Sequence, residues 1–330
     1  MTHPKITPTA AALLTLATLL WAGNAVVGRL IAGMVSPMTL NLIRWVLAFA
    51  LLLPMAAPVL RPGSPLWGSW RRFLLLSLLA IGAYNALLYL ALNTSTPINV
   101  TLVGSTTPVW MLLIGRIFFG FVISRRQWLG ALLSSGGVAV VLSRGDWNQL
   151  LGLRLVPGDL YMLLASAAWA YYSWMLAHPT TEPADIRRNW SAFLLAQIGF
   201  GLLWSSGSAA AEWAMGLGRL HLSWPLAGAL LFIACGPAVL AYRSWGAGVG
   251  RAGPSAAGFF VNLTPLFTAL LSSIFLGEAP HLYHATAFAL IVGGILVSSR
   301  RTSGIATTLA TALDSLSSTG CGVPLGAKMP

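Results

Sequence analysis

The stretch PINVTLVGSTTPVWMLLIGRIFFG, residues 97–120, recurs in altered form as PSAAGFFVNLTPLFTALLSSIFLG, residues 254–277. The alignment continues without a gap to Val140 and Val297, at a constant separation of 157 residues, the difference between 297 and 140. Identical pairs fall at matching positions in the two copies, namely Thr107-Pro108 with Thr264-Pro265, and Gly136-Gly137 with Gly293-Gly294. A match of this length predicts an internally duplicated chain.

The composition indicates the class of protein. Hydrophobic residues make up 57% of the 330 residues and charged residues only 8%, with a mean hydropathy of +0.78. An ordinary soluble domain has about 25% charged residues. The apolar segments are about 17 to 25 residues long, enough for an α-helix to cross roughly 30 Å of hydrocarbon, whereas barrel strands are about half as long and alternate in polarity. The sequence therefore predicts an all-α integral membrane protein.

The spacing of the apolar segments predicts ten transmembrane helices, five in each half of the chain. The expected spans are residues 9–29, 37–60, 73–92, 98–119, 128–143, 158–177, 190–210, 225–245, 255–276 and 282–299. We expect a first five-helix repeat over residues 9–144, a second over residues 158–301, and a cytoplasmic tail over residues 302–330. Tryptophans near the predicted span ends fit an interfacial aromatic belt, at Trp67, Trp70, Trp128, Trp147, Trp190, Trp213 and Trp224.

The positions of the basic residues predict the orientation. With a cytoplasmic N-terminus, twelve of the 19 Lys and Arg residues fall on the cytoplasmic side and four on the other. This bias favours both termini in the cytoplasm. The net charge of +12 is then mostly topological, and no basic motif indicates a nucleic-acid partner.

An odd number of spans per half has a geometric consequence, because the second copy must insert upside down relative to the first. The loop charges agree: Ser124-Arg125-Arg126 in a predicted cytoplasmic loop is replaced by His281-Leu282-Tyr283 in the matching external loop. The sequence therefore predicts a 5+5 inverted repeat. The alternative is chance similarity between helices rich in leucine and glycine.

Short motifs follow one another in a characteristic order along both halves. They are Trp21-Ala22-Gly23-Asn24, Val27-Gly28-Arg29, Arg44, Thr107-Pro108, Arg125 to Gly130, Gly158-Asp159-Leu160, Trp169-Ala170, and Leu263 to Glu278. In order and spacing, from about Thr9 to Arg301, they resemble the EamA-type members of the drug/metabolite transporter superfamily. The resemblance implies a ten-helix inverted-repeat carrier of the inner membrane that moves small metabolites, commonly outward. The family often has Leu-Gly-Glu after the fourth span, but this chain has Phe119-Gly120-Phe121 there and keeps the acid only as Glu278.

Three arginines lie inside predicted spans, where an ionisable side chain costs about 2.5 to 3.5 kcal/mol. Arg44 is the strongest candidate for substrate binding, because it lies beside Asn41 in an otherwise apolar segment and its fork can hold a carboxylate or phosphate. Its alternatives are pairing with backbone carbonyls and snorkelling to an interface. Arg116 and Arg243 lie nearer helix ends, where snorkelling is the simpler interpretation.

Polar and aromatic side chains in several spans could form the walls of a cavity. The candidates are Trp21, Asn24, Tyr84, Asn85, Tyr89, Trp110, Trp169, Tyr172 and Asn262. We favour Asn24 and Asn262 among them. The alternative for each amide is an interhelical hydrogen bond that only stabilises packing.

Pro108 and Pro265 occupy matching positions, each after a threonine. Proline removes a backbone donor, so both helices should bend there, and the threonine hydroxyl can satisfy a freed carbonyl. Paired interruptions of this kind indicate a midplane site or hinge, with a static kink as the alternative. The glycine pairs are expected to allow close helix contact, which includes contact between the protomers of a homodimer.

The sequence leaves the coupling mechanism open. Glu278 is a candidate gate or coupling residue, with His281 and His284 following it, although all three fit a solvated loop. No phosphate-binding glycine loop is present, so no ATP drive and no cofactor are expected. Cys235 and Cys321 form neither a disulfide framework nor a metal site by their spacing. Facilitated diffusion, exchange and proton coupling remain alternatives.

Together these features predict a secondary transporter, an exporter of small organic metabolites such as amino acids, that works by alternating access between two inverted repeats. Its expected partners are a small-molecule substrate and the lipid bilayer. A non-transporting membrane receptor or scaffold is the main alternative. A membrane enzyme is a further one, and it would need clustered acids, histidines or nucleophiles at one membrane face.

Overall fold

The computed structural model describes residues 6–95, 97–143, 146, 148, 156–276 and 282–299, apart from the side chains of residues 89, 93, 97, 98, 276 and 299. In these ranges every regular element is a helix. The elements are α1 (Pro8–Leu30), α2 (Pro37–Ala56), η1 (Ala57–Leu60), η2 (Pro65–Ser69), α3 (Trp70–Ser77), η3 (Leu78–Ala83), α4 (Tyr84–Thr94), α5 (Pro97–Gly104), α6 (Thr107–Phe119), α7 (Arg125–Ser143), α9 (Pro157–Ala177), α10 (Ala184–Arg188), α11 (Trp190–Ala214), α12 (Trp224–Ile233), η4 (Ala234–Leu240), α13 (Ala241–Ala252), α14 (Pro254–Val261), α15 (Leu263–Leu276) and α16 (Leu282–Ser299).

The helices confirm an all-α integral membrane protein. Among the described residues, seven helical stretches are long and apolar enough to cross a membrane, and the segment from Leu282 to Ser298 forms a shorter apolar helix. Large apolar side chains such as Ile117, Leu132 and Ile274 are exposed on the outer surface of these helices. Exposure of such side chains to lipid costs no free energy, because lipid tails are equally apolar, whereas their exposure to water is unfavourable.

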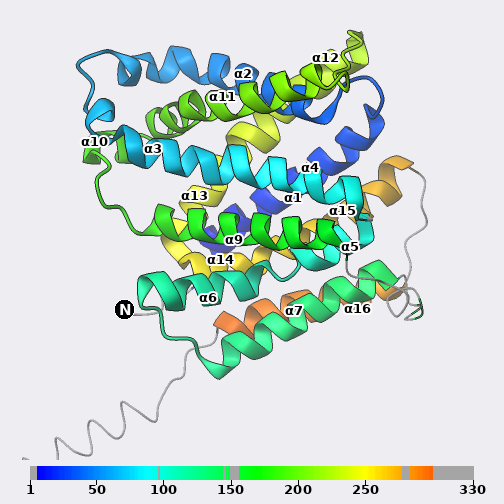
Figure 1. Ribbon diagram of the computed structural model, residues 1–330. Coiled ribbons are helices and arrows are strands. Elements are labelled where there is room, and N and C mark those ends of the chain that lie inside the picture. The colour runs from blue at the N-terminus through cyan, green and yellow to red at the C-terminus, as the bar shows by residue number, and fades with distance from the viewer. Residues whose placement is uncertain are drawn as a thin grey trace, which may run out of the picture. The chain divides into compact units, whose positions relative to one another are not determined.

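Helices from the two halves of the chain pack against one another (Figure 1). α7 lies along α16, and α2 lies along α11. α1 packs on α13 and α15 of the second half, and α9 packs on α4 and α6 of the first half. We call α1, η4 and α13 to α15 the α1 group, and α9, η3 and α4 to α6 the α9 group. The first helix of each half therefore belongs to a group built mainly from the other half.

Close packing of α7 on α16 depends on glycine. A Cβ atom added to Gly137 would lie 2.7 Å from Ile291 Cγ1 and 2.9 Å from the carbonyl oxygen of Ala287. A Cβ atom added to Gly136 or Gly293 would have no neighbour within 4 Å. A Cβ atom added to Gly294 would lie 2.7 Å from the carbonyl oxygen of Gly130, so the predicted close helix contact is present within the chain and uses one glycine of each pair.

Several predicted spans differ from the helices in length or regularity. Predicted span 190–210 continues as α11 to Ala214, and span 225–245 continues through α13 to Ala252. The α13 extension looks like a loop in sequence because it is rich in glycine. Its helix is stabilised by contact with α1, since a Cβ atom at Gly248 would lie 2.7 Å from Leu14.

Two predicted spans contain a π-helical segment, and two others are interrupted. η3 lies within predicted span 73–92, and η4 lies within the span that ends at α13. The predicted continuous spans 98–119 and 255–276 are each two helices, with the breaks at Ser105-Thr106 and at Asn262. The sequence predicted bends at the two Thr-Pro pairs but not the π-helical segments. π-Helical turns are rare and occur frequently at functional sites.

Candidate functional site

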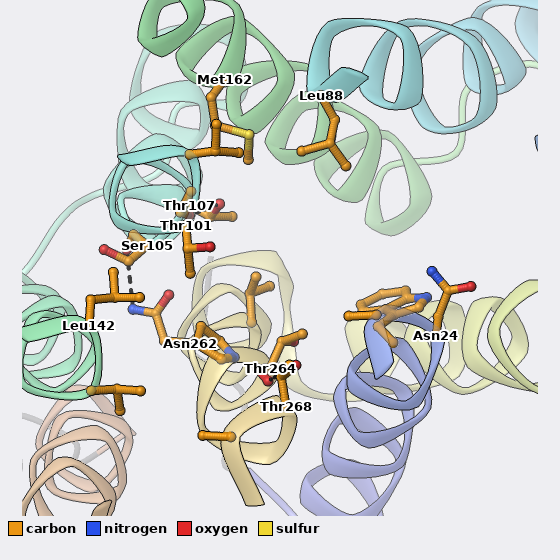
Figure 2. Close-up of a pocket in the computed structure, with 18 of the residues that line it drawn as sticks. Asn24, Leu88, Thr101, Ser105, Thr107, Leu142, Met162, Asn262, Thr264 and Thr268 are labelled. Atoms are coloured by element: carbon orange, nitrogen blue, oxygen red, sulfur yellow. Dashed lines mark hydrogen bonds between the residues drawn. The ribbon is translucent and has the colours of Figure 1, made fainter. Parts of the chain in front are cut away.

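A cavity of about 1050 Å³ lies between the α1 group and the α9 group (Figure 2). Arg44 from α2 and Leu142 from α7 also reach it. Eight of the residues predicted for the site or hinge line this cavity: Trp21, Asn24, Arg44, Tyr84, Asn85, Trp169, Asn262 and Pro265. The duplicated spans and their side chains thus converge on a space large enough for a small organic molecule.

Five other predicted residues are placed differently. Tyr172 is buried behind Trp169, with ring centroids 5.2 Å apart, and does not line the cavity. Trp110 packs on the hydrophobic core, and Pro108 is buried in the first turn of α6. The side chain of Tyr89 and the whole of Glu278 lie outside the described residues.

Arg44 is held by two amide side chains. Its Nη2 donates to Oδ1 of Asn41 at 2.7 Å and to Oδ1 of Asn85 at 2.9 Å. Its guanidinium lies 5.1 Å from the ring centroid of Trp45, and its buried Nε has no hydrogen-bond partner among the described residues. Within the described ranges the ion pair found is Arg72 with Glu182, so Arg44 has no carboxylate partner there. Its position is therefore fixed by neutral groups while its charge stays uncompensated.

The π-helical segment η3 connects this arginine to the second half of the chain. A π-turn leaves carbonyls without their usual helical donor. The Nδ2 of Asn85 donates to the carbonyl of Ile81 at 2.9 Å, and the hydroxyl of Tyr242 donates to the carbonyl of Ala80 at 3.0 Å. Asn85 thus bonds to both the backbone of η3 and Arg44, and Tyr242 lines the cavity beside them.

Aromatic rings form one wall of the cavity. Trp21 meets Trp169 edge to face at 5.2 Å, and Tyr84 lies 5.4 Å from Trp169. Trp245, 5.4 Å from Trp21, donates its Nε1 hydrogen to Ser173 Oγ at 3.2 Å and so joins the two helix groups. Rings packed in this way offer apolar faces to a bound molecule.

The two helix interruptions touch each other. Nδ2 of Asn262 donates to the carbonyl of Ser105 at 3.2 Å (Figure 2). It also donates to Ser134 Oγ at 2.9 Å. Ser105 and Asn262 are separated by 157 residues, the same offset as the repeat. The hydroxyl of Thr107 donates to the carbonyl of Gly104 at 2.6 Å, as the Thr-Pro pattern predicted. The buried hydroxyl of Thr264, in contrast, has no hydrogen-bond partner within the residues that the structure describes.

The cavity extends toward one end of the helices. Its lining includes Arg29 in the last turn of α1, Leu142 near the end of α7 and His284 at the start of α16. The opposite ends of the helices are packed together. There Phe119 stacks on Trp174 at 5.3 Å. We call the end near Arg29, Leu142 and His284 the open end, and the end near Phe119 and Trp174 the sealed end.

Charged groups also hold the sealed end together. Arg72 Nε lies 2.8 Å from Glu182 Oε1, and Arg72 Nη2 donates to the carbonyls of Met175 and His178. Burial raises the pKa of Glu182, but the hydrogen bonds from Arg72 and from backbone N–H groups such as that of Thr180 outweigh this and hold the pKa below its usual value. The carboxylate is therefore ionised at neutral pH.

Two buried carboxylates were not expected from the sequence. Glu212 lies beyond predicted span 190–210 but inside α11, and it accepts hydrogen bonds from Ser36, Met38 and Thr39 at the start of α2. Asp159 accepts hydrogen bonds from Ser95 and Asn99. Neither carboxylate lines the cavity. Both carboxylates connect helix ends through hydrogen bonds, so their role is structural.

Sequence reasoning also missed several cavity residues. The threonines Thr101 and Thr107 of the first interrupted span face Thr264 and Thr268 of the second (Figure 2). Thr107 and Thr264 occupy matching positions of the repeat and so carried a signal for this cluster, whereas Thr101 and Thr268 match Gly258 and Met111 and carried none. Tyr242 also lines the cavity and was not among the predicted residues. Its neighbour Arg243 is exposed and lies over the ring of Trp190 at 4.3 Å.

The fold and cavity define a multi-pass membrane protein with a solute-sized cavity between two groups of helices. The family model of the EamA-like transporter family matches residues 8–143 and 156–300, and the chain belongs to this family.

Relatives with names come from bacteria and archaea. The chain is 23% identical over 228 residues to an uncharacterized transporter, YyaM, of Bacillus subtilis, covering 69% of this chain and 72% of that protein. It is 24% identical over 292 residues to an uncharacterized transporter of Archaeoglobus fulgidus, covering 88% and 96%. It is 24% identical over 216 residues to the aromatic amino acid exporter YddG of Ancylobacter novellus, covering 66% and 71%. A solved crystal structure matches with a TM-score of 0.65 at 25% identity, covering 92% of this chain and 98% of that one.

Proposed function

We propose that this protein is a secondary transporter that exports small organic metabolites such as amino acids by alternating access. The cavity supports this most directly, because it reaches the open end while aromatic packing and the Arg72–Glu182 pair close the sealed end. A solute site that is reached from one side at a time is the basic requirement of a carrier. The name of the exporter YddG is consistent with a metabolite that leaves the cell.

The proposed architecture is ten transmembrane helices in a 5+5 inverted repeat. The 157-residue repeat supports it, as does the exchange of α1 and α9 between the two helix groups. In this arrangement Pro108 and Pro265 are the hinge candidates, because each lies in the first turn after an interruption. We place the protein in the inner (plasma) membrane with both termini in the cytoplasm, so that the sealed end faces inward.

Thiol accessibility tests alternating access without knowledge of the substrate. In a background with Cys235→Ser and Cys321→Ser, Thr268→Cys reports on the cavity and Ser173→Cys reports on the region behind the aromatic wall. We expect an impermeant thiol reagent to label Thr268→Cys from the open end and Ser173→Cys from the sealed end, with rates that change in opposite directions when a transported solute is added. A receptor or scaffold would keep Ser173→Cys protected from both sides.

Coupling is a separate part of the proposal. Glu278 is the candidate gate or coupling residue, because it is the acid that the family pattern places after the ninth span. We expect Glu278→Gln to remove any dependence of transport on a pH gradient while leaving exchange of solute across the membrane intact. If transport by the variant still depends on the pH gradient, Glu278 is a loop residue without a part in coupling.

A further inference from the structure

We propose that the cavity selects organic anions, with a carboxylate placed at Arg44 and an apolar or aromatic body placed against the rings of Trp21, Tyr84 and Trp169. This inference rests on the proposed transport function and specifies the chemical class of its substrate. The inference concerns the net charge of the substrate: it predicts that anions are preferred to zwitterionic amino acids, which the proposed function alone would favour.

The charges on the cavity wall are the first argument. The residues that line it include two arginines, Arg29 and Arg44, and among the described lining residues there is no aspartate or glutamate. The two buried carboxylates described above, Asp159 and Glu212, accept hydrogen bonds at helix ends and lie outside the lining. A bound ammonium group would therefore face two cations without a described carboxylate to neutralise it, whereas a bound carboxylate would be attracted.

The surroundings of Arg44 are the second argument. A buried charge usually pairs with an opposite charge, but the described partners of this guanidinium are amide oxygens. Both Nη2 hydrogens are donated to Asn41 and Asn85, while Nε is buried with no partner in the described part of the chain. A carboxylate would bond to the remaining donors or displace Asn85, which lines the cavity while Asn41 does not. If the carboxylate displaced Asn85 from Arg44, the hydrogen bond from the Asn85 amide to the carbonyl of Ile81 in η3 would also be released.

Comparison with the other intramembrane arginines is the third argument. Arg116, in the last turn of α6, and Arg243, near the start of α13, are exposed side chains, and Arg243 rests on the ring of Trp190. Neither lines the cavity. Arg44 alone among these three combines a place on the cavity wall with fixed side-chain orientation. Arg243 therefore provides a matched control, since it too is an arginine within a membrane helix.

Four compounds with one indole body and different charges test the inference. They are indole-3-propionate, tryptophan, tryptamine and tryptophol, which are an anion, a zwitterion, a cation and a neutral alcohol. Exchange of each compound is measured in proteoliposomes that contain the full-length chain. We expect indole-3-propionate to be exchanged at least tenfold faster than each of the other three, at equal concentration. Arg44→Gln should abolish this preference, and Arg243→Gln should keep it.

Several results would overturn the inference. These are exchange of tryptamine, tryptophol or tryptophan at the rate of the anion, an anion preference that survives in Arg44→Gln, and exchange of none of the four. If Arg44→Gln does not fold, Asn24→Asp replaces it, because Asn24 lines the cavity and this variant adds a carboxylate to the cavity wall without removing a donor to η3. The anion preference should then fall at least tenfold, and its survival would contradict the inference.

The thiol labelling described above distinguishes failure of this inference from failure of the transport function. If Ser173→Cys and Thr268→Cys still change in opposite directions with some other solute, the protein is a carrier with a different substrate class. If Ser173→Cys stays protected under all conditions, the transport function fails as well.

Discussion

The two π-helical segments occupy matching positions in the two halves but form in different ways. Leu78–Ala83 shifted by 157 residues becomes 235–240, which lies within η4, Ala234–Leu240. η4 contains Pro237, which lacks a backbone N–H and so breaks the regular hydrogen bonding locally. η3 has Ala80 at the matching position, and its freed carbonyls depend on donors elsewhere, including one from the second half. One irregularity is thus encoded locally, whereas the other depends on tertiary partners.

The donors to η3 strengthen this comparison. Asn85 and Tyr242 are themselves separated by 157 residues, and both donate to η3. Among the described residues, no side chain donates a hydrogen bond to the matching carbonyls of η4, those of Pro237 and Ala238, where proline already accounts for the break. The half that carries Asn85 is also the half that carries Arg44. We infer that the asymmetry between the halves concentrates the polar chemistry on one side of an otherwise repeated scaffold.

Asn85→Leu should have the largest effect on stability. The variant removes the donor to the carbonyl of Ile81 and one of the two acceptors of Arg44 Nη2, which keeps its bond to Asn41. Each lost partner of a buried polar group costs about 1 to 3 kcal/mol. We expect a loss of about 2 to 4 kcal/mol in the free energy of unfolding, measured by thermal or denaturant unfolding in detergent. A loss below about 0.5 kcal/mol would mean that η3 does not need this donor.

Gly137→Val should come next, with a loss of about 1 to 3 kcal/mol from overpacking between α7 and α16. Its Cβ atom would approach the backbone of Ala287, which cannot move aside as a flexible side chain could. Gly136→Val is the matched control, because a Cβ atom there has no neighbour within 4 Å. If Gly136→Val were as damaging as Gly137→Val, the open glycine face would be covered by a second protomer, and the size of the purified complex would show it.

Glu182→Gln tests the sealed end, for which the second half has no counterpart, since Ala229 is the residue 157 positions after Arg72. We expect a loss of about 1.5 kcal/mol at neutral pH, typical of a hydrogen bond to a charged group. Because the folded pKa of Glu182 is lowered, its carboxylate stabilises the protein above the ordinary pKa of 4.5, and this contribution is lost as the pH falls through the folded pKa.

The stability of wild type and Glu182→Gln is therefore compared from pH 3 to pH 7. The difference should be constant near neutrality and should decrease as the pH falls below 4.5 toward the lowered pKa of folded Glu182. A difference that stays unchanged at pH 3 would show that the variant disturbs packing and not the ion pair.

The sequence predicted the class of fold and part of the cavity, for physical reasons that particular residues make clear. Helix spans follow from apolar length, and Arg44 and Asn85 were found because polar groups in a span are costly. Glu212 was missed because a run of small residues made α11 look shorter than it is. η3 was missed because its carbonyls depend on Tyr242, which no local pattern connects to Ala80.

Tyr242→Phe should have a smaller effect than Asn85→Leu. The variant removes one hydroxyl, which leaves the carbonyl of Ala80 without that donor, although Nδ2 of Asn85 lies 3.5 Å from it. We expect a loss of about 1 kcal/mol in the free energy of unfolding. The double variant Asn85→Leu with Tyr242→Phe should lose more than the sum of the two single losses, because each donor partly replaces the other at η3. Strict additivity would show that the two donors act independently.

Pro237→Ala should have the smallest effect on stability and is the most direct test of the comparison. Alanine restores the N–H that proline lacks, so a locally encoded π-segment should relax toward a regular α-helix, with a change in unfolding free energy within about 0.5 kcal/mol in either direction. Because Pro237 lines the cavity, this relaxation should rotate the residues that follow it, including Tyr242, and should alter the rate of solute exchange more than it alters stability. If exchange and stability are both unchanged, η4 is maintained by its packing on α2 and α13, as η3 is maintained by tertiary donors, and the two segments are more alike than their sequences indicate.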